Sequence, residues 1–178
     1  MRDVLRSCAS EIQDIDIVVD GSDCLDKSVA GLNPTRTKFG GWRFSVERWE
    51  FDVWRVEDTW AFQSHIPFEG IESILEIPFF NWDAVLFDVQ EKALIHTPGY
   101  LESLDRGYLD VNFGVNPNPL RMAAKTIRFL KGGASLSRSL ENILRGWVRT
   151  YGKYRIIEES VERYSIPPSF AKKALDAY

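Results

Sequence analysis

Two carboxylates, Asp14 and Asp16, lie one residue apart in the segment "QDIDIVVDGSD", among isoleucines and valines. The density of β-branched residues predicts a strand. Side chains two positions apart on a strand point to the same face, so these carboxylates repel one another unless a cation lies between them. Mg²⁺ prefers oxygen ligands and is often held by one or two carboxylates and substrate phosphates. The spacing predicts a metal site of the kind used in phosphoryl transfer, and a solvated strand face is the alternative.

A third acid is expected from a neighbouring strand. Asp52 follows Phe51 and precedes Val53 in "EFDVWR", so it faces away from the apolar side of its strand. Glu50 shares that face and is the second candidate. We therefore predict that Asp52 joins Asp14 and Asp16 as a metal ligand and catalytic carboxylate.

Strands and helices must bring these residues together. Alternating apolar residues in 42–46 and 51–56 predict two antiparallel strands of one sheet, and "DAVLFDVQEKALIH" predicts two more around a turn at 90–92. From Pro119 the apolar period becomes helical, and three further helices are expected after Gly132-Gly133. The expected fold class is α+β, a mixed or antiparallel sheet with flanking helices. Residues 1–118 would form a head, and residues 119–178 a short helical extension.

Composition narrows the possible partners. The chain has 178 residues, which suits one domain or one domain with a short appendage. No stretch approaches the roughly 20 apolar residues that span a bilayer, and the first residues carry no apolar signal region. We expect a cytoplasmic protein with no membrane partner.

Charge is distributed unevenly along the chain. Residues 1–120 hold 10 Lys and Arg against 21 Asp and Glu, whereas residues 121–173 hold 12 Lys and Arg against 4 Glu. This asymmetry suits a protein that holds cations at one site and a polyanion beside it. A helical segment with a solvated basic face is the alternative.

Four segments, in order, resemble the head domain of poly(A) polymerases and CCA-adding enzymes, within the polymerase-β-like nucleotidyltransferase superfamily. The first runs from Arg2-Asp3 through a short helix to the Asp-x-Asp strand, and the second is the acidic strand position at Asp52. The third is "FNWDAVLFDVQEKALIH", in which Asp83 stands where the family has Asn. The fourth is "NPLRMAAKTIRF", which matches a basic helix of the family at Pro119, Arg121, Arg128 and Phe129, with Lys125 in place of an Arg.

The resemblance implies a nucleotidyltransferase-like sheet and an enzyme that moves a nucleoside monophosphate from an NTP such as ATP to a hydroxyl acceptor. RNA, a small molecule or a protein could supply that hydroxyl. A two-metal Mg²⁺ site would lie on Asp14, Asp16 and Asp52. The nucleotide would contact residues from both ends of the matched region: Arg2, Asp3, Arg121, Lys125 and Arg128. The last three share one face of a helix, and a solvated helix face is the alternative for them.

Two parts of the family pattern have no counterpart. The Gly-Gly pair before Arg-Asp is missing, and "LEIPFF" occupies the place of an Arg-Arg-Asp segment. The length also leaves no room for the family's body and tail domains, so a full CCA-adding enzyme is not expected. The alternative function is therefore a catalytically degenerate protein of this fold that binds a nucleotide or a partner.

Overall fold

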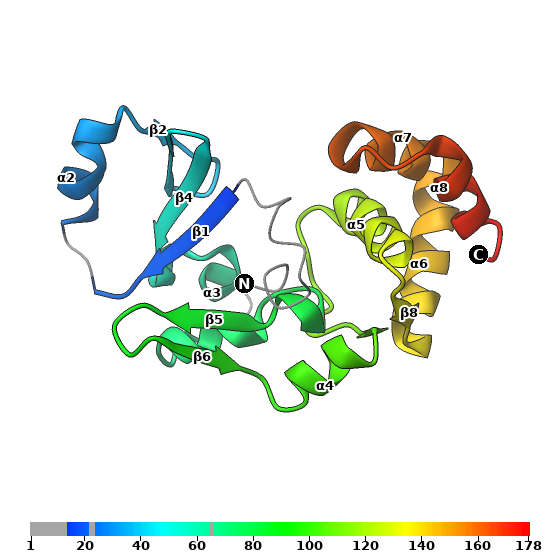
Figure 1. The fold of residues 1–178 in the computed structure, drawn as a ribbon, viewed down its shortest axis with the longest axis horizontal. Coiled ribbons are helices and arrows are strands. Elements are labelled where there is room, and N and C mark those ends of the chain that lie inside the picture. The colour runs from blue at the N-terminus through cyan, green and yellow to red at the C-terminus, as the bar shows by residue number, and fades with distance from the viewer. Residues whose placement is uncertain (1–13, 22–23, 65) are drawn as a thin grey trace. The chain divides into compact units, whose positions relative to one another are not determined.

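A computed structural model describes residues 14–21, 24–64 and 66–178 (Figure 1). Arg2 and Asp3, two of the predicted nucleotide-binding residues, lie outside these ranges. The chain divides into two compact units, Met1–Ile74 and Leu75–Tyr178. The boundary predicted between residues 118 and 119 coincides with the start of a helix inside the second unit, and that domain division stays a prediction.

The first unit is built on a four-stranded mixed sheet in the order β1 (Asp14–Val19), β4 (Trp49–Arg55), β3 (Trp42–Val46), β2 (Thr35–Arg36) (Figure 1). β1 pairs in parallel with β4, and the other neighbours are antiparallel. The predicted first strand and the predicted antiparallel pair are thus confirmed. Short helices complete the unit: α2 (Leu25–Val29), η2 (Ala30–Leu32), η3 (Val56–Asp58) and α3 (Trp60–Ser64), with η4 (Ile71–Glu76) at the junction with the next unit.

One face of this sheet is apolar, which leaves the other face for charged residues. Val53 is buried against Leu25 and Val29 of α2, and the rings of Phe44 and Phe51 stack with their centroids 5.3 Å apart. Gly41 permits the close approach of β3 and β4, because a Cβ there would lie 2.9 Å from the Val53 carbonyl oxygen. Alternation along β4 then turns its acidic residues away from this packed face.

The second unit contains the predicted hairpin, which follows the short helix η5 (Asn81–Asp83). β5 (Val85–Asp88) pairs antiparallel with β6 (Ala93–His96). In the turn, Oδ1 of Asp88 accepts hydrogen bonds from the backbone N–H groups of Gln90 and Glu91. Helix α4 (Tyr100–Asp105) follows, and the two-residue strands β7 (Tyr108–Leu109) and β8 (Ser135–Leu136) form a parallel pair.

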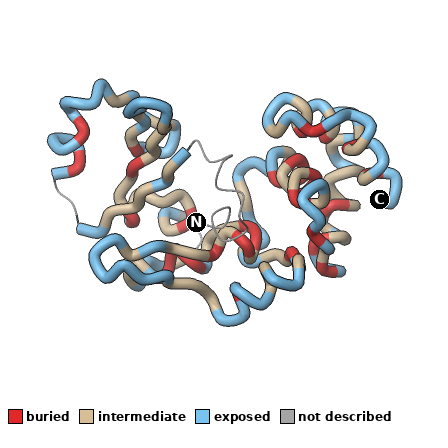
Figure 2. Tube along the Cα trace, in the orientation of Figure 1, coloured by how far each residue is buried: buried red, intermediate tan, exposed pale blue. Residues whose placement is uncertain are grey.

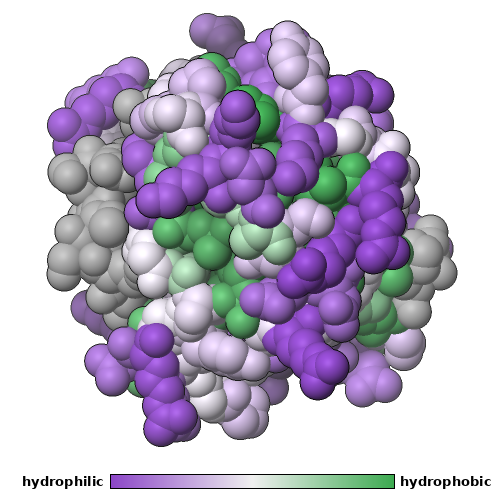
Figure 3. Space-filling model, turned by 90° about the vertical axis from the view of Figure 1, so that its right-hand side faces the viewer, coloured by the Kyte–Doolittle hydropathy of each residue, from purple (hydrophilic) through white to green (hydrophobic). Residues whose placement is uncertain are grey.

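Four helices make up the rest of the second unit: α5 (Pro119–Lys131), α6 (Arg138–Tyr151), α7 (Lys153–Tyr164) and α8 (Pro168–Leu175). Pro119 and Pro168 occupy first-turn positions, where the missing N–H costs no hydrogen bond. Figure 2 shows buried positions recurring along α5 and α6, as their helical apolar period predicts. Hydrophilic side chains cover much of the face drawn in Figure 3, with hydrophobic ones visible between them.

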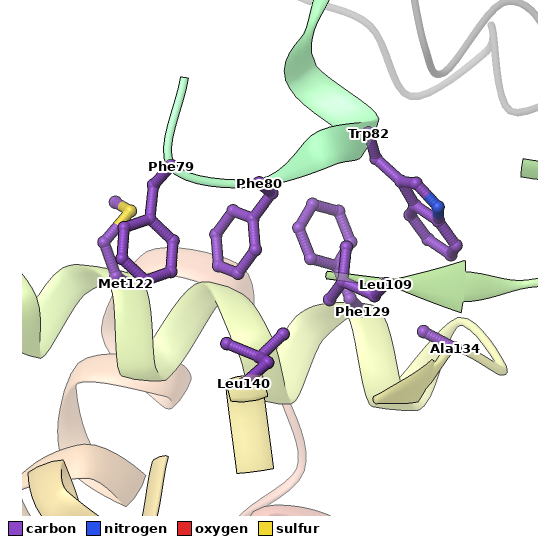
Figure 4. Close-up of a cluster of buried hydrophobic side chains, with 8 residues drawn as sticks. All are labelled: Phe79, Phe80, Trp82, Leu109, Met122, Phe129, Ala134 and Leu140. Carbon is purple, nitrogen blue, oxygen red and sulfur yellow. The ribbon is translucent and has the colours of Figure 1, made fainter. Parts of the chain in front are cut away.

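Two hydrophobic clusters stabilise this unit. In the first, Phe79, Phe80 and Trp82 pack onto Met122 and Phe129 of α5 (Figure 4), and the Phe80 and Phe129 rings meet edge to face with centroids 5.2 Å apart. The second joins α5 to the three later helices through small and branched residues: Ala123, Ile127, Leu144, Ile156, Ile166, Ala171 and Leu175.

The predicted α+β fold class is confirmed, with a mixed sheet, flanking helices and a helical end. Within the described ranges, no helix is long and apolar enough to cross a membrane.

Candidate active site

The parallel pairing of β1 with β4 places four acidic residues on one face of the sheet. Asp14 lies beside Glu50, and Asp16 lies beside Asp52. Neighbouring positions of paired strands share a face, and the apolar residues between these acids occupy the opposite one. Asp14 and Asp16 are exposed, whereas the side chain of Asp52 retains 24% of its accessible surface. The structure therefore brings together the three predicted carboxylates and the second candidate, Glu50.

A guanidinium lies among these acids. Arg43 of β3 is the antiparallel partner of Asp52, and its Nε donates to Oδ1 of Asp52 at 2.7 Å. A terminal nitrogen of Arg43 donates to Oδ2 of the same carboxylate, at 2.5 Å, so that the pair is bidentate. The other terminal nitrogen lies 3.4 Å from Oε1 of Glu50. Both oxygens of Asp52 therefore already accept hydrogen bonds from a cation.

The negative charge of this face raises the pKa of Arg43. Its pKa is raised above the ordinary value, chiefly because it donates a hydrogen bond to Asp52. The negative charges of Asp52, Glu50 and Asp16 add to this effect, and partial burial opposes it. The charge of Asp16 thus reaches Arg43 across β4, as expected for one shared acidic face.

The donor chemistry of this face suits a divalent cation. Asp14 and Asp16 are exposed carboxylates on one side of a strand, and Mg²⁺ commonly takes one or two carboxylates together with substrate phosphates. Among residues 14–21, 24–64 and 66–178, however, no group of three or more His, Cys, Asp or Glu is placed to hold a metal ion. Asp14 and Asp16 therefore suit a divalent cation as a pair of ligands, and the addition of Asp52 as a third ligand stays a prediction.

The predicted nucleotide-binding face of α5 lies in the second unit, and its three cations have different surroundings. Arg121 is exposed. Nζ of Lys125 lies 2.7 Å from Oδ2 of Asp83 in η5 (Asn81–Asp83), with both side chains about four-fifths buried. The guanidinium of Arg128 lies 5.5 Å from the centre of the Tyr164 ring in α7. Of the three, Arg121 is the most accessible to a phosphate.

Arg43 and Asp83 are the residues of these sites whose contacts the sequence reasoning did not predict. A usable signal for Arg43 was present, because the loop of Glu47 and Arg48 between β3 and β4 has only two residues. A two-residue hairpin loop determines the register, and in that register Arg43 faces Asp52. The pairing of Asp83 with Lys125 joins positions 42 residues apart and has no comparable local signal.

The fold is similar to that of solved enzymes that bind CTP or process tRNA. A CCA-adding enzyme in complex with CTP matches 99% of this chain at a TM-score of 0.71 and 19% sequence identity, and 45% of that enzyme is covered. A tRNA-processing enzyme with CTP matches 89% of this chain and is itself covered to 45%, at a TM-score of 0.64 and 23% identity. An apo form of a tRNA-processing enzyme gives a TM-score of 0.61 at 21% identity, with coverages of 89% and 47%.

These similarities confirm the predicted resemblance to the CCA-adding type at the level of the fold. The chain spans less than half the length of each of these three enzymes. No protein-family model matches the sequence, and no curated protein matches it.

Proposed function

We propose that this chain is a metal-dependent nucleotidyltransferase that transfers a nucleoside monophosphate from an NTP to a hydroxyl acceptor. The observation that carries the proposal is the parallel register of β1 and β4, which aligns Asp16 with Asp52 and keeps Asp14 on the same exposed face. The similarity in fold to enzymes solved with CTP supports an NTP as the donor.

Asp14 and Asp16 would hold Mg²⁺ at the sheet face, in one or two sites that include substrate phosphates. A cation held there would supply positive charge that offsets the negative charge developing as pyrophosphate leaves. Asp52, one strand away, would complete the site as a metal ligand and would accept a hydrogen bond from the attacking hydroxyl. Its side chain is partly buried and accepts a hydrogen bond from Arg43 of β3, which would have to be released for that role.

Cations outside this sheet stay predicted nucleotide contacts. Arg121, Lys125 and Arg128 remain the proposed phosphate or base contacts on α5, with Arg2 and Asp3 near the start of the chain. Arg121 is best suited to the task, because it is exposed and a guanidinium can bind phosphate oxygens in a bidentate manner. Lys125 would first have to leave Asp83.

RNA is the proposed acceptor class, because the enzymes of similar fold include CCA-adding and tRNA-processing ones. The chain spans less than half the length of those enzymes, so this acceptor is proposed for the chain in its full protein context. A cytoplasmic location stays a prediction.

One observation favours the second candidate function, a catalytically degenerate module that binds a nucleotide or a partner. The guanidinium of Arg43 already donates to both oxygens of the proposed catalytic carboxylate, Asp52. In such a module the guanidinium would take the place of the cation permanently, and the fold would be kept for binding alone.

A binding experiment tests the metal site. Mg²⁺ and a non-hydrolysable NTP are titrated by calorimetry into the wild-type chain and into an Asp14→Asn/Asp16→Asn double variant. We expect the double variant to lose Mg²⁺-dependent nucleotide binding, because the exposed ligand pair is gone. A Glu47→Gln/Glu72→Gln variant is the matched control, since it removes two exposed negative charges elsewhere in the first unit. Equal binding by all three proteins would contradict the metal site.

A transfer assay separates the two candidate functions. The chain is incubated with Mg²⁺, an NTP labelled at the α-phosphate and mixed RNA acceptors. Label joined to RNA in the wild type, and absent with Asp52→Asn, supports the enzyme. Nucleotide binding without any label transfer supports the module instead.

A further inference from the structure

Arg43 was not among the predicted site residues, yet its side chain contacts the acidic residues of the site. It lies on β3, a strand with neighbours on both sides, and pairs in register with Asp52 of β4. Its three guanidinium nitrogens are all directed to carboxylates, two to Asp52 and one to Glu50. The side chain nevertheless keeps 49% of its accessible surface, so solvent and a ligand can both reach it.

Without a nearby positive charge, the four carboxylates of this face would repel one another. Four carboxylates occupy adjacent positions of two paired strands, and like charges placed side by side on a sheet destabilise it. Among the described residues, Arg43 contacts two of them, and the raised pKa of its guanidinium also reflects the charge of a third, Asp16.

We infer that Arg43 is an internal counter-ion that competes with a divalent cation for the acidic face, so that its ion pair with Asp52 lowers the metal affinity of the site. The inference rests on the proposed metal site at Asp14 and Asp16. Its physical basis is twofold. A metal at this face is repelled by the guanidinium, and it gains Asp52 as a ligand only by displacing hydrogen bonds that Arg43 already makes.

A consequence is that metal loading and the Arg43–Asp52 pair are coupled. When the metal binds, Asp52 is drawn toward Asp16, and Arg43 keeps Glu50 as its remaining partner. When the metal leaves, Arg43 again neutralises Asp52. The site would therefore resist metal at low concentration and accept it together with a nucleotide, whose phosphates add negative charge.

Arg43→Gln tests the competition, and Arg36→Gln is its matched control. Arg36 lies on β2 of the same sheet and also pairs with an aspartate, Asp26, at 3.1 Å. Its register partner is Trp42, which packs on the apolar face, so Arg36 lies on the side opposite the acids. Both changes remove one positive charge and one Arg–Asp ion pair from the first unit.

Mg²⁺ binding is measured by calorimetry at constant ionic strength, with Mn²⁺ detected by electron paramagnetic resonance as a second probe. We expect Arg43→Gln to bind Mg²⁺ about tenfold more tightly than the wild type, because a nearby positive charge is removed. Arg36→Gln should stay within about twofold of the wild type, because its charge lies across the sheet. In thermal unfolding, metal-free Arg43→Gln should melt below the wild type, and added Mg²⁺ should raise its melting temperature more than that of the wild type.

A second variant covers the case in which Arg43→Gln does not fold. Arg43→Lys keeps the charge but replaces the bidentate contact with a single point of contact, and we expect about threefold tighter Mg²⁺ binding from it. Adding Asp52→Asn to Arg43→Lys should remove its gain, because that gain requires the released carboxylate. Adding it to Arg43→Gln should remove only part of the gain, because the repulsion by the guanidinium is absent in either case.

The outcomes separate the inference from the function on which it rests. Mg²⁺ binding that is equal or weaker in the Arg43 variants, with binding by the wild type intact, overturns the competition and leaves the proposed function standing. Absence of Mg²⁺ binding from the wild type and from every Arg43 variant overturns both. Tighter binding by Arg36→Gln to the same extent as Arg43→Gln also overturns the inference, since net charge alone would then explain the gain.

Discussion

At the scale of single residues, Arg43 and Lys125 each form an ion pair with an aspartate, but their burial differs. The Arg43 side chain is half exposed on a sheet face, whereas the Lys125 side chain, paired with Asp83, is mostly buried. Nζ of Lys125 also lies 5.7 Å from the ring centres of both Phe80 and Phe129, two members of the cluster in Figure 4. These contacts indicate that Lys125 stabilises the second unit as well as carrying charge.

Replacing Lys125 should therefore lower stability. Lys125→Met leaves the carboxylate of Asp83 mostly buried without its lysine, and we expect a loss of about 1–2 kcal/mol in the free energy of unfolding. The figure lies below that for a fully buried pair, because both side chains keep about a fifth of their surface. Urea denaturation followed by circular dichroism provides the measurement. Lys131→Met, at an exposed position of the same helix, is the control and should change stability little.

A result in which Lys125→Met unfolds at the same urea concentration as the wild type would contradict the structural role. Lys125 would then be available to a nucleotide, as the sequence predicts. Adding Asp83→Asn to Lys125→Met should recover part of the lost stability, because the buried charge is removed as well.

At the scale of elements, most helices and strands could be predicted because their apolar periods are long. β1, the β3–β4 pair, the β5–β6 hairpin and α5 carry clear periods of two or 3.6. β7 and β8 have two residues each and no period to detect, and they pair only because the chain between them returns through α5. The parallel pairing of β1 with β4 depends equally on the rest of the sheet.

The start of α6 is determined by a local interaction, the hydrogen bond of its N-cap side chain. Ser135 and Ser137 both precede this helix and both carry a hydroxyl that can cap it. In the structure Ser137 is the N-cap. Its Oγ accepts a hydrogen bond from the backbone N–H of Leu140 at 3.0 Å and donates one to Oδ1 of Asp110. Ser135 instead belongs to β8, where its N–H bonds to the carbonyl of Gly107.

Removing this cap should destabilise the second unit. Ser137→Ala loses the capping bond and leaves Asp110 without its hydroxyl donor, so we expect a loss of about 1–2 kcal/mol. Ser139→Ala, at an exposed position two residues further along, is the control and should be neutral or slightly stabilising. Thermal unfolding of both variants distinguishes them, and equal melting temperatures would show that the cap contributes nothing.

At the scale of the whole molecule, the sequence predicted the fold more completely than it predicted the residues of the site. The match to a CCA-adding enzyme covers 99% of this chain at only 19% identity, because core positions require apolar residues of suitable size and period rather than particular groups. A site requires specific groups at specific positions. Sequence order could suggest Asp14, Asp16 and Asp52, but the guanidinium among them follows from the sheet register.

The topology of the first sheet also has a kinetic consequence. β3 and β4 are joined by two residues and can pair early, whereas β1 must find β4 across the whole intervening α2–β3 segment. The Arg43–Asp52 contact would then form with the hairpin, before the acids of β1 arrive. Arg43→Gln should accordingly slow refolding more than it speeds unfolding in stopped-flow chevron measurements. If only unfolding accelerates, the ion pair forms after the folding barrier, and β1 docks against a hairpin whose charge is still uncompensated.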